Sequence, residues 1–263
     1  MEITKINDNI YRITTEYKDI WTTLYVIKTD MGDMLFDAAS FDSDAEKYTL
    51  PFLKECGVTK ESLKYIFISH DHSDHAGGLN ALLPHYPDAV VLSRSSDLKN
   101  RFAEYNVTAP SESDQFLDVL EVVTIVGHTC DCAAILDKRT KTLITGDCLQ
   151  VWGIVGSQNW AANIRFPVEY FADIEKVSKM DIDQILTAHD YYPLGYRADD
   201  KAEIMRYLEG CRQPLLKLKD LILTNPDTDD QGICDIYNVG KHIPTFHAGV
   251  VKYIRAAMKK GKF

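Results

Sequence analysis

At four points in this 263-residue chain, an apolar run ends on a residue that can bind a metal ion. In each case the candidate ligand follows the last residue of the run by one or two positions: His70 after Ile68, His128 after Val126, Asp147 after Thr145, and His189 after Ala188. Such runs predict buried strands, whose ends meet at one edge of a sheet and hold ligands rigidly. A polar residue that simply begins a loop explains any one of these cases. It does not explain why five of the eight histidines lie at these run ends or within a few residues after them, namely His70, His72, His75, His128 and His189.

The densest cluster runs from Ser69 to Gly78, with the sequence SHDHSDHAGG. It places three imidazoles and two carboxylates after the apolar run Tyr65–Ile68 and before a Gly-Gly pair that can lead into a helix. Imidazole and carboxylate are ligands of zinc and of other divalent first-row metals. The cluster therefore predicts a metal site at the end of a strand.

Composition narrows the range of partners. The formal charge of −10 and the pI of about 5.2 argue against nucleic acid and against anionic membrane surfaces as partners. No apolar run approaches the roughly 18 residues of a membrane span. The N-terminus lacks a secretory pattern, and the six scattered cysteines suit free thiols. These features predict a cytoplasmic protein.

Hydrophobic periodicity predicts two regions. Residues 1–200 alternate predicted strands and helices and include all of the candidate ligands, so they are the candidate catalytic domain. Residues 201–263 are predicted to form a helical extension packed on the same domain. A helix is expected over 44–56, kinked or split at Pro51. Residues 148–168 form a long irregular segment, a kind of segment that is often functional.

The motifs carry a family resemblance. His70-x-His72-x-Asp74-His75, followed by Gly127-His128-Thr129, Thr145-Gly146-Asp147 and Ala188-His189, resembles the metallo-β-lactamase superfamily, in particular its glyoxalase II and lactonase-like branch. The resemblance implies an α/β fold of four layers. This is the αβ/βα sandwich, in which two mixed β-sheets pack face to face with helices outside and the metals at one edge.

The resemblance also implies the ligands, residue by residue. It assigns His70, His72 and His128 to one metal, Asp74, His75 and His189 to a second, and Asp147 to a bridge between them. The resemblance implies two divalent ions, with zinc as the first choice of metal and iron or manganese as alternatives. Asp74 and Asp147 are the candidate catalytic carboxylates. Asp37 resembles the carboxylate that accepts a hydrogen bond from a ligand histidine and fixes its tautomer.

The implied activity is hydrolysis of a small ester, thioester or lactone by a metal-bridging hydroxide, as in hydroxyacylglutathione hydrolases or lactonases. β-Lactamase and phosphodiesterase activities on the same site are alternatives. A diiron redox protein is a further alternative, although such relatives usually show Glu in place of His72 and carry an added flavin domain. For the oligomeric state, a homodimer is one alternative.

Five residues are candidates to line the substrate site. The related lactonases carry a catalytic Tyr three positions after the bridging Asp, where this chain has Gln150. Trp152 and Trp160 make the segment 148–168 either a hydrophobic flap or a loop anchored on the core. Tyr191 and Tyr192 follow His189 and could reach a substrate carbonyl or serve packing.

Overall fold

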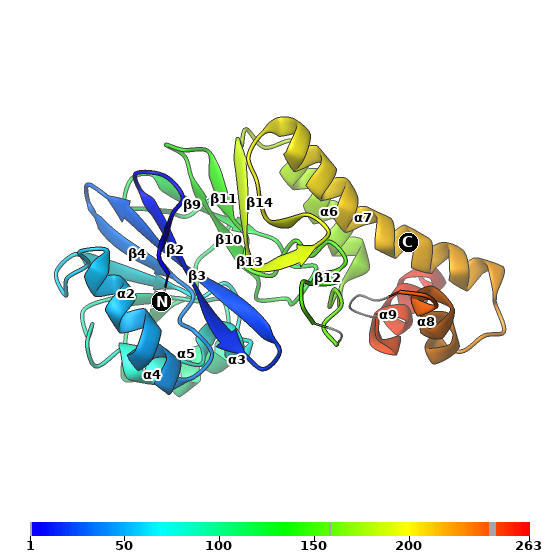
Figure 1. Ribbon diagram of the computed structural model, residues 1–263, viewed down its shortest axis with the longest axis horizontal. Coiled ribbons are helices and arrows are strands. Elements are labelled where there is room, and N and C mark those ends of the chain that lie inside the picture. Colours follow the sequence, from blue (N-terminus) through cyan, green and yellow to red (C-terminus); the bar gives the residue numbers. More distant parts are fainter. Residues whose placement is uncertain (1, 158, 242–245) are drawn as a thin grey trace. The chain divides into compact units, whose positions relative to one another are not determined.

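The computed structural model describes residues 2–157, 159–241 and 246–263. The chain forms two compact units, Met1–Thr124 with Ala133–Arg139, and Ile125–Cys132 with Thr140–Phe263. Strands and helices occur in both units (Figure 1).

The first unit contains a seven-stranded mixed sheet whose strands follow one another in chain order. Strands β1 to β4 pair antiparallel, and β4 to β7 pair parallel. The turn before Gly32 joins β3 to β4 in a hairpin, with Thr29 paired to Gly32. The strands are β1 (Thr4–Lys5), β2 (Ile10–Tyr17), β3 (Ile20–Thr29), β4 (Gly32–Phe36), β5 (Leu63–Phe67), β6 (Val90–Leu92) and β7 (Val107–Thr108).

The helices of the first unit bury their apolar side chains in a core with one face of this sheet. Strand residues such as Leu24, Leu35 and Ile66 share that core with helix residues such as Phe52 and Leu79. The helical segments are α1 (Asp42–Asp44), the π-helix η1 (Ala45–Thr49), α2 (Leu50–Glu55), α3 (Ser73–Ala76), α4 (Leu79–Leu82) and α5 (Ser96–Arg101).

The expected break at Pro51 takes the form of a π-helical segment. Pro51 stands in the first turn of α2, and η1 directly precedes it. A proline has no N–H to donate and its ring clashes with the carbonyl four residues earlier, here that of Lys47. The backbone around Lys47 adopts the wider π turn, so the chain stays helical from Asp42 to Glu55.

The first unit is completed by an antiparallel ladder. β9 (Leu120–Thr124) pairs with β8 (Gln115–Phe116) and with β10 (Ala133–Asp137). The N–H of Ala133 donates to the carbonyl of Ser69 over 3.0 Å, so the start of β10 is bonded to the residue before His70. The ladder thereby supports the histidine motif.

The second unit contains the remaining strands. Its central strand β13 (Gln184–Tyr192) pairs parallel with β11 (Thr142–Ile144) and antiparallel with β12 (Gly153–Ile154) and β14 (Gly195–Ala198). The sequence predicts this central strand only as far as Ala188. It continues to Tyr192 because β12 supplies hydrogen-bonding partners for its last residues.

The helices in the described part of the second unit are α6 (Pro167–Ser178), α7 (Lys201–Thr224), α8 (Asp230–Asn238) and α9 (Ala248–Lys259). α7 begins at Lys201, where the sequence predicts the C-terminal extension, and the side chain of Asp200 caps it by accepting from the N–H of Glu203. The domain division at residue 200 itself stays a prediction. None of the helices within the described ranges is both long and apolar enough for a membrane span.

The predicted fold class is confirmed, because the structure contains two mixed β-sheets accompanied by helices. The long segment 148–168 includes the short strand β12 and a bridge between Gly153 and Ala161, so it is more ordered than the sequence suggests.

Gly77, the residue after α3, lies where the backbone of the first unit leaves no room for a side chain. A Cβ atom at this position would lie 1.8 Å from the carbonyl oxygen of Ser40 and 2.5 Å from that of Ser73. Both obstacles are backbone atoms, which cannot move aside without distorting the helix that carries the motif.

We expect Gly77→Ala to destabilise the fold by roughly 3 kcal/mol or more, because overpacking against backbone is among the most costly substitutions. Gly249→Ala is the matched control. Gly249 lies in α9, and no atom lies within 4 Å of the place that a methyl group would take there, so alanine should stabilise the helix by up to about 1 kcal/mol. Urea unfolding of both variants measures the two changes, and equal stabilities would contradict the packing argument.

Candidate metal centre

The parallel pairing of β4 with β5 creates the first half of the centre. Phe36 pairs with Phe67 at the carboxyl ends of these strands, so the residues that follow emerge at the same edge of the sheet. Asp37 accepts hydrogen bonds there from the N–H of Ser69 over 2.8 Å and from its hydroxyl over 3.0 Å. Asp37 adopts a φ of 63°, a left-handed conformation that Asp tolerates better than most residues.

Asp37 orients His75, as the sequence predicts for the carboxylate after β4. Its Oδ2 lies 2.7 Å from His75 Nδ1, and both side chains are fully buried. A carboxylate only accepts, so Nδ1 carries the proton and Nε2 keeps the lone pair that a metal requires. Burial raises the pKa of Asp37, whereas His75 and the hydrogen bonds from Ser69 act in the opposite direction.

The other ligands of the first unit surround His75. The His70 ring lies 4.2 Å from the His75 ring and 4.5 Å from the His72 ring, measured between centroids. His75 Nε2 lies 3.3 Å from Asp74 Oδ2, and the hydroxyl of Thr22 donates to that same oxygen over 3.1 Å. The four predicted ligands of the HxHxDH motif thus form one cluster within this unit.

The second half of the centre also arises from a parallel strand pair. β11 pairs with β13, and Ile144 lies opposite Leu186. Asp147 follows β11 and His189 lies on β13, which brings His189 Nε2 to 3.1 Å from Asp147 Oδ1. The other carboxylate oxygen, Oδ2, lies 3.8 Å from His128 Nε2. Asp147 therefore offers one oxygen toward each histidine.

His128 is oriented by a backbone carbonyl. Its Nδ1 lies 2.5 Å from the carbonyl oxygen of Asn163. A carbonyl cannot donate, so Nδ1 carries the proton and the metal-binding lone pair falls on Nε2, the nitrogen that faces Asp147. The imidazole is almost fully buried, which prevents it from turning toward solvent.

α6 fixes the backbone that precedes His128. The Asp173 carboxylate accepts from the N–H of Gly127 over 2.8 Å. A Cβ at Gly127 would lie 2.5 Å from the side chain of Tyr170, so only glycine allows this approach of loop and helix. Burial raises the pKa of Asp173 to about 6, against the opposing hydrogen bonds from Gly127 and Val126.

Two of the predicted substrate-lining residues direct their polar atoms at Asp147. The Gln150 side chain is 3% exposed and its amide donates to the Asp147 carbonyl over 3.0 Å. Tyr191 is fully buried and its hydroxyl donates to Asp147 Oδ1 over 2.9 Å. Burial and the nearby Asp147 raise the pKa of Tyr191 well above its ordinary value. Their burial favours positioning of Asp147 over contact with a substrate.

The tryptophans of the segment 148–168 are half-buried. Trp152 packs on α8, with its ring 5.5 Å from that of Tyr237, and the Lys241 ammonium lies 4.5 Å from the centre of the indole. Tyr192 at the end of β13 is 40% exposed and is the most accessible of the five substrate candidates that the sequence proposes. Substrate contact by Trp152, Trp160 and Tyr192 stays a prediction.

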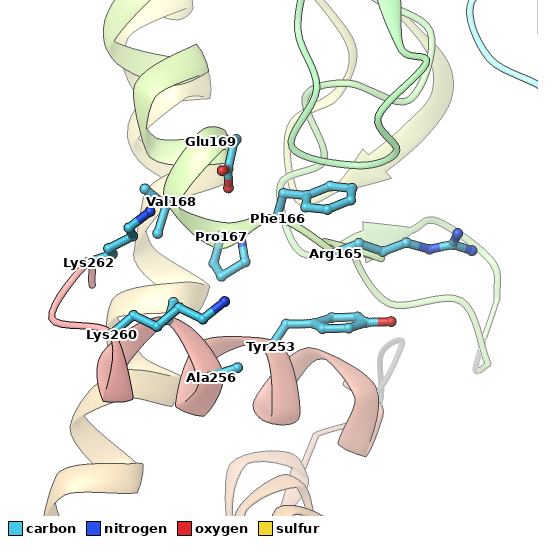
Figure 2. Close-up of a pocket in the computed structure, with 10 residues that line it drawn as sticks. Arg165, Phe166, Pro167, Val168, Glu169, Tyr253, Ala256, Lys260 and Lys262 are labelled. Atoms are coloured by element: carbon cyan, nitrogen blue, oxygen red, sulfur yellow. The ribbon is translucent and has the colours of Figure 1, made fainter. Parts of the chain in front are cut away.

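The end of this segment faces α9. Phe166 lines a cavity of about 220 Å³ with Pro167, Tyr253 and Lys260, whereas the guanidinium of Arg165 points away from the lysine (Figure 2). The segment thus contacts the C-terminal helices at two points, because Trp152 packs against α8 and Phe166 lines a cavity with residues of α9.

The donor set suits a divalent transition metal. Both units contain side chains of the kinds that bind metal ions. They are His70, His72, Asp74 and His75 in the first unit and His128, Asp147 and His189 in the second. Neutral imidazoles with a fixed tautomer and buried carboxylates are the ligands that zinc and similar ions select.

A family model describes the same region of the chain. The model of the metallo-beta-lactamase superfamily matches residues 22–155, about half of the sequence. The chain belongs to the metallo-beta-lactamase superfamily. Members of this superfamily are typically metal-dependent hydrolases, as the sequence motifs predict, and the predicted enzyme class is confirmed.

Relatives in sequence share only part of the chain. A hydroxyacylglutathione hydrolase of Francisella tularensis is 31% identical over 143 residues, 54% of this chain and 55% of the relative. The uncharacterized protein YobT of Bacillus subtilis is 25% identical over 65% of this chain and 84% of the relative. The chain spans about half the length of the hydroxyacylglutathione hydrolases that it matches.

Solved structures agree with the fold. A metallo-beta-lactamase family protein from Thermus thermophilus matches with a TM-score of 0.69 at 15% identity, covering 98% of this chain and 95% of that one. The metallo-beta-lactamase from Pontibacter korlensis matches with a TM-score of 0.61 at 17% identity, covering 80% and 98%. At these identities the likeness concerns the fold alone.

Several residues that shape the site escaped the sequence analysis. Thr22, Asn163, Tyr170 and Asp173 contact ligands or the backbone beside them, yet they belong to none of the recognised motifs. Asp173 carries the one available signal, because it is an acidic residue on the buried face of the amphipathic helix α6. A buried carboxylate needs a hydrogen-bond donor or a cation as its partner, and the sequence alone does not identify that partner.

We expect Asp173→Asn to change how stability depends on pH. The folded pKa of about 6 lies above the ordinary value of 3.8, so the folded state holds this proton more tightly and stability is lost as pH rises from about 4 through 6. The loss amounts to at most about 3 kcal/mol, since one pKa unit corresponds to about 1.4 kcal/mol.

Urea unfolding between pH 4 and 8 measures this effect as the difference between unsubstituted protein and variant. The asparagine variant should lose less stability than the unsubstituted protein over that interval. Glu175→Gln on the same helix is the control. The ion pair with Lys179 lowers the pKa of this exposed carboxyl, so its titration changes stability in the opposite direction, and the variant should keep the fall in stability that Asp173 causes. Parallel curves for the Asp173 variant and the unsubstituted protein would contradict the assignment.

Proposed function

We propose that the chain is a dinuclear-metal hydrolase that cleaves a small ester, thioester or lactone. The observation that carries this proposal is the carboxylate of Asp147, which turns one oxygen toward His189 and the other toward His128. A carboxylate arranged in this way can bridge two ions, each bound by histidines on its own side.

The proposed ligand sets come from the resemblance of the sequence motifs to those of the superfamily, with Asp147 as the bridge. His70, His72 and His128 bind one ion, and Asp74, His75 and His189 bind the other. Each ion then has three terminal ligands besides Asp147, which leaves coordination positions open, as catalytic sites require. The histidine-rich set favours zinc, with iron or manganese as alternatives.

When bound, a metal pair of this kind lowers the pKa of water, polarises a substrate carbonyl and stabilises the leaving oxygen or sulfur. The residues of the chain supply orientation. Asp37 and the Asn163 carbonyl hold the protons of His75 and His128 on Nδ1, and Thr22 and Tyr191 each donate to a ligand carboxylate. Fixed tautomers and fixed carboxylates keep the ligand atoms directed at the ions.

A side-chain nucleophile is not part of the proposal. Cys148, the residue next to Asp147, is fully buried, and burial raises the pKa of its thiol well above the ordinary value. A thiol in that state is a poor nucleophile. Water is therefore the proposed attacking group.

The proposed substrate class rests on the relatives. By their name, the hydroxyacylglutathione hydrolases act on hydroxyacylglutathione, which is a thioester, and they are about 30% identical to this chain over half of its length. Esters and lactones contain the same kind of reactive carbonyl, so they belong to the same proposal. The proposed location is the cytoplasm, in keeping with six cysteines that form no disulfide in the described structure.

Purified protein from metal-replete expression should carry about two transition-metal ions per chain. The proposed ligands provide three side chains for each ion, and Asp147 is shared between the two ions. Elemental analysis measures the number and identifies zinc, iron or manganese. Metal-free protein after such expression would contradict the proposal.

A substrate panel tests the reaction. We expect hydrolysis of S-lactoylglutathione or an acyl-homoserine lactone, and loss of at least 100-fold in kcat/KM for Asp147→Ala, whose fold should persist in circular dichroism. A β-lactam and bis-nitrophenyl phosphate complete the panel. If the protein hydrolysed only the β-lactam or only bis-nitrophenyl phosphate, that compound would define the substrate class in place of the proposed one. Full activity of the Asp147→Ala variant would contradict the role of Asp147 as the bridging ligand.

A further inference from the structure

Gln150 holds two parts of the candidate centre through its side-chain amide. The Oε1 atom accepts from the N–H of Asn163 over 2.7 Å, and Nε2 donates to the carbonyl of Asp147 over 3.0 Å. A backbone N–H can only donate and a carbonyl can only accept, so these two partners fix the orientation of the amide.

One partner of the amide is a candidate ligand, and the other contacts one. Asn163 supplies the carbonyl that holds the His128 proton on Nδ1, and Asp147 is itself the candidate bridge. Gln150 Nε2 also lies 3.1 Å from His128 Nδ1, so the amide packs against the imidazole ring. One side chain therefore sets the position of His128 relative to Asp147.

The backbone of Gln150 is anchored as firmly as its side chain. Its N–H donates to the Tyr170 hydroxyl over 2.8 Å, and that hydroxyl donates to the Gln150 carbonyl over 2.6 Å. Tyr170 is fully buried on α6 and packs against Gly127. The amide is thus attached to the same helix that fixes the loop before His128.

We propose that Gln150 is a positioning residue that sets the geometry of His128 and Asp147 for metal binding. The inference rests on the proposed dinuclear function. It replaces the substrate-lining role that the sequence suggests for this residue, because the side chain is 3% exposed and both ends of its amide are engaged. The selection of substrate is then left to other residues.

Two variants and one control test this inference. Gln150→Glu keeps the shape and the acceptor but loses the donor to Asp147, and Gln150→Leu loses both. Gln184→Leu is the control. Gln184 is the first residue of β13, and its side-chain amide bonds to Thr142 and Asp199, which are not candidate ligands. Zinc affinity by chelator competition and the visible absorption spectrum of the cobalt-substituted protein are measured for each.

Both Gln150 variants should bind at least one metal equivalent roughly 10- to 100-fold more weakly and show altered cobalt spectra. The control should match the unsubstituted protein in both readouts. Where the leucine variant does not fold, the nearly isosteric glutamate variant decides.

Folded Gln150 variants with unchanged affinity and spectrum would overturn the inference, and so would a change confined to KM, which indicates substrate contact. A failure of the proposed function is distinguishable from these outcomes, because in that case the unsubstituted protein itself binds no metal pair.

Discussion

Parallel pairing of neighbouring strands is the constraint on which the rest of the structure depends. β4 with β5 in the first unit, and β11 with β13 in the second, each bring two chain segments to the same edge of a sheet. The pairing places Asp37 beside Ser69 and Asp147 beside His189. Because hydrogen-bonded strands cannot shift their register cheaply, the ligand residues that follow them inherit fixed positions.

Buried polar contacts then convert position into orientation. Each imidazole has two nitrogens, and a metal requires a particular one to be free of its proton. Asp37 settles this choice for His75 and the Asn163 carbonyl settles it for His128. Burial makes these bonds strong, since an unsatisfied partner would cost about 1–3 kcal/mol. Binding a cation there would also relieve the cost of holding several imidazoles and carboxylates out of water.

The 148–168 segment links this centre to the C-terminal helices. Gln150 belongs to the buried network around Asp147, whereas Trp152 packs on α8 and Phe166 lines a cavity with residues of α9. Within the second unit, a change in the packing of α8 or α9 can therefore reach the ligands through a short stretch of chain. These contacts show what Trp152 and Phe166 pack against, whereas the role of Trp160 stays a prediction.

The sequence by itself determined the family and the α/β class, and it proposed the ligand residues. Metal ligands must be particular residue types at strand ends, and such a pattern can be read directly from the order of residues. It also identified Asp37, whose carboxylate follows a strand. Only the tertiary structure shows which groups Gln150 and Tyr191 contact, since a polar residue near a motif can face either a substrate or a ligand. Asn163 acts through its backbone carbonyl, which every residue has. Thr22 and Asp173 come from distant strands and helices, and only folding brings them to their partners.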